Sequence, residues 1–102
     1  MKKFDVHTHL GYSKGESDLL THLEEAGLYG ACIFSYPPKE HNPAIGKDFD
    51  ARLEHVLGFV SKDRERLYPV LWVHPDEPNI IDNIDKAVEA GVAAFKMICN
   101  NY

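Results

Sequence analysis

The sequence lacks the features that mark membrane, secreted and nucleic-acid-binding proteins. No apolar run in its 102 residues approaches the ~20 that a membrane helix needs. The N-terminus, MKKFDVHTH, has no apolar stretch of the kind found in signal peptides. The net charge of −5 gives no reason to expect nucleic acid or an anionic membrane as a partner, since both favour clustered Lys and Arg. We therefore expect a cytoplasmic protein with neither nucleic acid nor a membrane as a partner.

Cysteine is also scarce. Cys32 and Cys99 are isolated and lack metal-ligand spacing, which favours two free thiols in a reducing compartment, although one disulfide between them stays open. The remaining composition, 44% hydrophobic and 26% charged, is ordinary for a globular protein. The length allows one domain at most, spanning 1–102.

Four β-prone runs alternate with three amphipathic stretches. Ser17 and Asp48 are typical N-caps, Pro78 suits a first helical position, and Gly27 and Gly91 end helices. The pattern predicts strands over 3–9, 29–35, 67–73 and 92–98, and helices over 18–26, 49–62 and 78–90.

A β-α-β-α-β-α-β order predicts an α/β fold with parallel strands joined by right-handed crossovers. The segment 36–47, YPPKEHNPAIGK, holds three prolines and a glycine and is expected to be a loop. It follows the second strand, at the end where ligand-binding loops of parallel α/β proteins lie, and its length favours a functional role.

The first strand, within FDVHTHLG, carries the most specific chemistry. Side chains alternate along a strand, so Asp5, His7 and His9 are expected on one face. Two imidazoles at i and i+2 can converge on one ion, and zinc takes neutral histidine nitrogens as ligands. The alternative is two solvated histidines at an exposed strand end.

Three segments together resemble the amidohydrolase superfamily of metal-dependent barrel hydrolases. FDVHTHLG resembles the opening strand with its Asp-x-His-x-His motif, LWVHPDEP resembles the end of strand three, and GVAAFKMI resembles strand four. The similarity is greatest to the amidohydrolase-2 branch that includes decarboxylases of the aminocarboxymuconate-semialdehyde type. It is diffuse over nearly the whole chain, and only the first motif is specific.

The resemblance implies a (β/α)₈ TIM-barrel type of fold, of which this chain holds four strands and three helices. It implies His7 and His9 as ligands of a divalent metal, zinc with manganese as the alternative. The implied activity is a metal-dependent hydrolase, in which metal-activated water attacks a carbonyl or related carbon of a small-molecule substrate, or a metal-dependent decarboxylase.

Two further residues are candidates for substrate or metal contact. In binuclear members of the family a carboxylated lysine at the position of Lys96 bridges two metals; a lysine at the barrel mouth, or one reaching a substrate carboxylate, is the alternative. The family often continues with His-Pro after this lysine, and here Met97 follows instead. His74 could meet substrate at the mouth or could hydrogen-bond to a loop.

The other histidines and the large aromatics carry weaker expectations. His41 lies in the proline-rich loop, and His22 and His55 are expected on helix surfaces. Trp72 and Phe95 are expected in the core.

The chain carries only part of the implied site, because the family takes further ligands from later strands. Its size corresponds to the N-terminal half of a barrel that needs ~250 residues. Such a half exposes sheet edges, which predicts self-association. Two alternatives stay open: a metal-dependent nuclease or phosphoesterase of TatD or PHP type, which also opens with His-x-His, and a non-catalytic half-barrel module.

Overall fold

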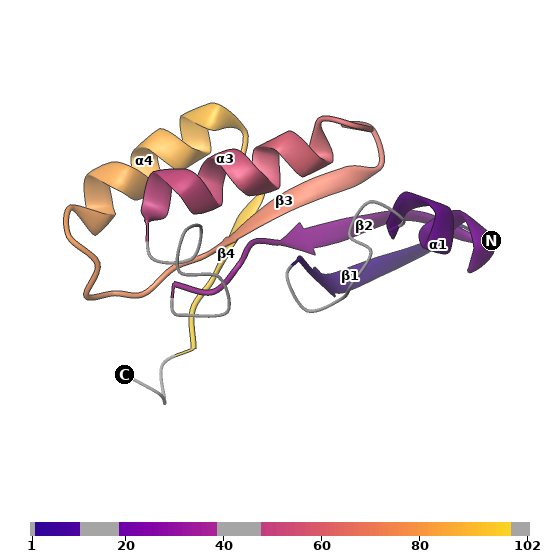
Figure 1. Cartoon of the computed structure of the whole chain (residues 1–102), viewed down its shortest axis with the longest axis horizontal. Helices are drawn as coiled ribbons and strands as arrows, with labels where there is room; N and C mark the ends of the chain where they lie inside the picture. Colours follow the sequence, from indigo (N-terminus) through magenta and orange to yellow (C-terminus); the bar gives the residue numbers. More distant parts are fainter. Residues whose placement is uncertain (1, 11–18, 39–47, 99–102) are drawn as a thin grey trace.

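The computed structural model describes residues 2–10, 19–38 and 48–98. Within these ranges four strands and three helices alternate along the chain (Figure 1). The order is β1 (Lys3–His9), α1 (Leu19–Glu25), β2 (Leu28–Phe34), α3 (Phe49–Val60), β3 (Leu67–Trp72), α4 (Ile80–Ala90) and β4 (Ala94–Lys96).

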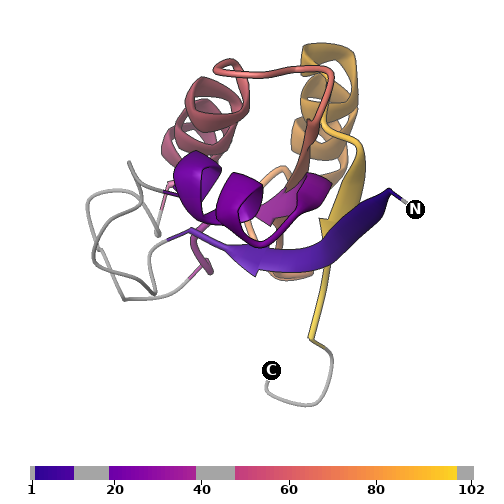
Figure 2. The same ribbon diagram turned by 90° about the vertical axis from the view of Figure 1, so that its right-hand side faces the viewer.

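The strands form one parallel sheet in the order β1-β2-β3-β4. The sheet curls, and the helices lie together on one side of it, with α3 and α4 next to each other (Figure 2). This is an α/β half-barrel with the parallel strands that the alternation predicted, and all three helix-strand crossovers join parallel neighbours, as expected.

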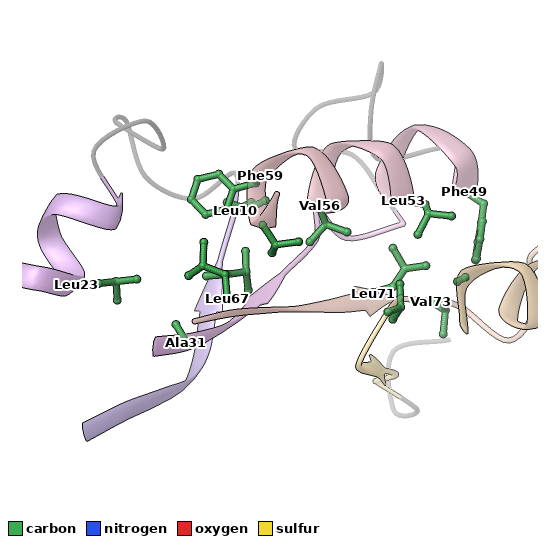
Figure 3. Packing of buried hydrophobic residues seen from close by; sticks show 14 residues of the cluster. Leu10, Leu23, Ala31, Phe49, Leu53, Val56, Phe59, Leu67, Leu71 and Val73 are labelled. Carbon is green, nitrogen blue, oxygen red and sulfur yellow. The ribbon is translucent and has the colours of Figure 1, made fainter. Parts of the chain in front are cut away.

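The core lies between the helices and the sheet (Figure 3). Leu53, Val56 and Val60 of α3 pack at the 3- and 4-residue spacing of a helix face. They meet alternate residues of the strands, such as Ala31 and Ile33 of β2, which are fully buried. The opposite face of the sheet bears no helix in the described residues.

The predicted helix ends are partly confirmed. Asp48 caps α3 by accepting a hydrogen bond from the Ala51 N–H at 3.2 Å. Gly91 ends α4 with a φ of +103°, a left-handed conformation in which glycine is favoured. The prediction for Pro78 is wrong: α4 begins two residues later, after Asn79 in a left-handed conformation with a φ of +54°. Ser17 lies outside the described residues.

A buried ion pair joins α3 to the loop between β3 and α4. The guanidinium of Arg52 is fully buried and donates to Glu77 Oε1 at 2.6 Å. The second carboxylate oxygen of Glu77 accepts the His74 backbone N–H at 2.9 Å. One carboxylate therefore neutralises the arginine and fixes the chain just after β3.

We predict that Glu77→Ala lowers the free energy of unfolding by about 3–5 kcal/mol, because it removes a carboxylate that pairs with the fully buried Arg52 guanidinium and accepts the His74 backbone N–H. The matched control is Asp50→Ala, which removes the exposed pair with Lys86 and should cost less than about 1 kcal/mol. Urea denaturation followed by circular dichroism measures both. Equal losses in the two variants would contradict the assigned role of Glu77.

Two glycines offer a second matched pair. A Cβ on Gly30 would collide with the backbone carbonyl oxygen of Arg66 and would lie 2.9 Å from the Phe4 ring, whereas a Cβ on Gly58 would meet nothing within 4 Å. We expect Gly30→Ala to destabilise the chain by about 1–3 kcal/mol. Gly58→Ala, inside α3, should stabilise it by about 0.5–1 kcal/mol. The same urea denaturation measures both variants. If Gly30→Ala were more stable than the wild type, the close packing of Gly30 against Arg66 and Phe4 would be contradicted.

Candidate functional site

Polar and aromatic side chains gather on the helix-free face, where the strands end. In the sheet register His9 pairs with Phe34, and Trp72 pairs with Lys96. Paired residues in parallel strands point to the same side of a sheet. The four side chains from β1, β2, β3 and β4 therefore face one region.

The two histidines of β1 converge there. The Nε2 atoms of His7 and His9 are 2.7 Å apart, and their ring centroids are 4.6 Å apart. Both rings also contact the ring of Phe34, at centroid distances of 4.6 and 5.0 Å. His7 is exposed and His9 half-buried.

Asp5 does not join them as expected. The register is shifted between Asp5 and Thr8, so that Asp5 pairs with the buried, helix-facing Ala31 while His9 pairs with Phe34. This irregularity interrupts the strict alternation on which the shared face of Asp5 and His9 depended. The Asp5 carboxylate instead accepts the backbone N–H of His7 at 2.8 Å and so supports the strand locally.

Lys96 completes the cluster from β4. Its ammonium lies 3.3 Å from His9 Nε2 and 4.0 Å from the centroid of the Trp72 ring. An ammonium can only donate, so His9 Nε2 accepts in its hydrogen bond with Lys96. Burial lowers the pKa of Lys96.

The protonation of His9 is opposed by its surroundings. Burial, the Lys96 ammonium and the His7 ring, in that order, lower the pKa of His9 from 6.5 to about 4. The imidazole is therefore neutral near pH 7, and a neutral ring is the form that binds a metal ion.

The histidine pair fits a metal ion but does not complete a site. Two nitrogens bound to one tetrahedral zinc at ~2.0–2.1 Å lie roughly 3.3 Å apart. The Nε2 atoms of His7 and His9, at 2.7 Å, would therefore have to move apart only slightly to bind one ion. Across the described residues, however, no group of three His, Cys, Asp or Glu side chains could hold a metal. A catalytic zinc generally takes three protein ligands.

The other candidates lie apart from this cluster or outside the described residues. His74 is buried just after β3, and its Nδ1 accepts the Asp76 backbone N–H at 3.0 Å. His22 is exposed on α1, and His55 of α3 lies half-buried against the ring of Tyr36. His41 and Cys99 are not among the described residues.

Sequence reasoning missed two members of the site. Trp72 was expected in the core, but its neighbours Leu71 and Val73 are the fully buried residues, and the Trp72 ring lies on the opposite face against His9 and Lys96. Phe34 was not singled out, although its alternation with the buried Ile33 could have placed it there. Phe95 packs half-buried against the core, as expected.

A buried serine holds the end of β3 in place beneath Trp72. Ser35 Oγ accepts the Trp72 backbone N–H at 3.0 Å and donates to the Tyr36 carbonyl at 2.9 Å. The serine side chain thus replaces a backbone acceptor where β2 ends.

We predict that His9 titrates near pH 4 in the metal-free protein and that Lys96→Met raises its pKa by removing the adjacent positive charge. Since the unfolded chain binds this proton near pH 6.5, stability should fall as the pH drops from 6.5 towards 4. NMR titration of the imidazole resonances, assigned with His9→Gln, measures the pKa. The control variant Lys86→Met, at an exposed position of α4, should leave the pKa of His9 unchanged. A wild-type value near 6.5 would contradict the described surroundings.

No helix in the described residues is long and apolar enough to cross a membrane. No protein-family model matches the chain, and no curated protein or solved structure matches it either.

Proposed function

We propose that this chain supplies the first four strands and the first two metal ligands of a TIM-barrel hydrolase of amidohydrolase type. The observation that carries the proposal is the convergence of His7 and His9, with Nε2 atoms 2.7 Å apart, at the carboxyl end of β1. Active sites of parallel β/α barrels lie at this end of the strands.

The chemistry follows from the donor set. A bound zinc or manganese ion supplies Lewis acidity and a water of lowered pKa, which suits hydrolysis at a carbonyl carbon or the related decarboxylation. His7 and His9 would hold that ion, and further ligands come from strands other than the four described. The half-barrel by itself is expected to be inactive.

The surrounding residues prepare the histidines for this role. The lowered pKa of His9 keeps the ring neutral, so no proton has to leave before the ion binds. Phe34 contacts both rings and restricts their orientation. Lys96, held over Trp72, places a positive charge beside the pair, where it can orient a polar substrate.

We expect the purified chain to bind zinc or manganese, and His7→Ala/His9→Ala to lose that binding. His22→Ala, which removes an exposed histidine of α1, is the matched control and should retain it. Elemental analysis after dialysis and calorimetric titration with ZnCl₂ measure the bound metal. Equal metal content in the wild type and the double variant would overturn the site.

A further inference from the structure

One of the two nitrogens that would bind the metal ion already has a cation beside it. The Lys96 ammonium donates a hydrogen bond to His9 Nε2 at 3.3 Å. A neutral imidazole has a single nitrogen that can accept, and it accepts through one lone pair. A bond from His9 Nε2 to a metal ion uses the same lone pair. His9 therefore cannot bind the ion and accept from Lys96 at the same time.

We propose that Lys96 is a placeholder for the metal ion. In the metal-free chain its ammonium holds the lone pair of His9 Nε2, and it leaves that nitrogen when the ion binds. Lys96 is thus a positioning residue that acts on the metal through His9, and it is not a ligand. This role rests on the proposed function, because the ion is the one that His7 and His9 would hold.

The other contacts of the ammonium are weak enough for it to leave His9. It lies 4.0 Å from the centroid of the Trp72 ring and 5.5 Å from the centroid of the Phe34 ring. Among the described residues no carboxylate forms an ion pair with Lys96. A cation over a ring face is held less firmly than one paired with a buried carboxylate. An arriving ion therefore has to replace one hydrogen bond and no ion pair.

The same two rings give the displaced ammonium a place to remain. Its contacts with Trp72 and Phe34 do not involve His9 Nε2, so they persist when that hydrogen bond is broken. Ser35 Oγ accepts the Trp72 backbone N–H at 3.0 Å, which holds the end of β3 in position. The charge of Lys96 thus stays beside the site, where the proposed function uses it to orient a polar substrate.

The hydrogen bond also selects the tautomer of His9. Because Nε2 accepts from Lys96, the hydrogen of the neutral ring lies on Nδ1. This is the tautomer that can bind a metal ion through Nε2, the atom that lies 2.7 Å from His7 Nε2. Lys96 therefore keeps His9 in the form that metal binding requires, although its ammonium has to leave before the ion binds.

These two effects of Lys96 on metal affinity oppose each other, and their sizes decide the sign. Holding one ring in one of two comparable tautomers raises the affinity only about twofold. Breaking a hydrogen bond to a charged group lowers the affinity about tenfold or more. The net expectation is that Lys96 weakens metal binding, which is the opposite of what a ligand does.

The first experiment determines the tautomer of His9 in the metal-free chain. Heteronuclear NMR of the imidazole nitrogens, at neutral pH in EDTA and assigned with His9→Gln, distinguishes a nitrogen that carries hydrogen from one that does not. We expect His9 Nε2 to lack hydrogen in the wild type, and the two tautomers to mix in Lys96→Met. A wild-type His9 with its hydrogen on Nε2 would overturn the role of Lys96, whether or not the variant folds.

The second experiment measures zinc affinity by calorimetric titration with ZnCl₂. Lys96→Met removes the ammonium and keeps a long unbranched side chain, and circular dichroism shows whether the variant is folded. We expect it to bind zinc about tenfold more tightly than the wild type, because no hydrogen bond has to break and no like charge lies beside the ion. The control variant Lys86→Met removes an exposed charge from α4 and should bind zinc like the wild type.

The two measurements together separate the alternatives. Equal zinc affinity in the wild type and Lys96→Met would overturn the placeholder role and leave the metal site intact. Weaker binding by Lys96→Met would mean that Lys96 is a ligand. A gain in affinity with no change in the tautomer of His9 would reflect charge repulsion alone, and either of these results would also overturn the placeholder role. If neither protein binds zinc, the metal site itself is wrong and the placeholder role is overturned with it.

Discussion

The arrangement at the carboxyl ends of the strands depends on one buried charge. The Arg52 guanidinium has no exposure to solvent, and Glu77 is the described carboxylate that pairs with it. A charge at this depth is tolerated only when it is paired and hydrogen-bonded. The pair clamps α3 to the loop after β3, and the same carboxylate holds the His74 backbone. Trp72, two residues earlier, is thereby kept in line with Lys96 and with the histidines of β1.

The parallel sheet and its helices could be predicted from sequence because hydrophobic spacing and caps are local signals. The stripe of Leu53, Val56 and Val60 and the cap at Asp48 lie within a few residues of one another, and the structure confirms both. Pro78 was misplaced because Asn79 adopts a left-handed conformation that delays the helix, and no local pattern announces this. The barrel beyond these four strands stays a proposal.

The site was predictable along β1 from its motif and at Lys96 of β4 from the family resemblance. His7 and His9 were identified because both belong to one short motif, whereas Trp72 and Phe34 join them through pairing between strands far apart in sequence. Trp72 was expected in the core but lies on the helix-free face, because composition cannot tell the two faces of a strand apart. Asp5 was misplaced because alternation assumes a regular strand, and β1 is not regular.

The register shift in β1 affects which of its side chains can reach one face of the sheet. Phe4 pairs with Gly30 and His9 with Phe34, five residues apart on β1 and four on β2. The extra residue acts as a phase shift, so that Phe4 beside Tyr68 and His9 beside Phe34 can both project from the helix-free face. Before the irregularity, Phe4 packs against Tyr68. After it, His7 and His9 form the histidine pair. One face of the sheet therefore receives side chains from both even and odd positions of a single short strand.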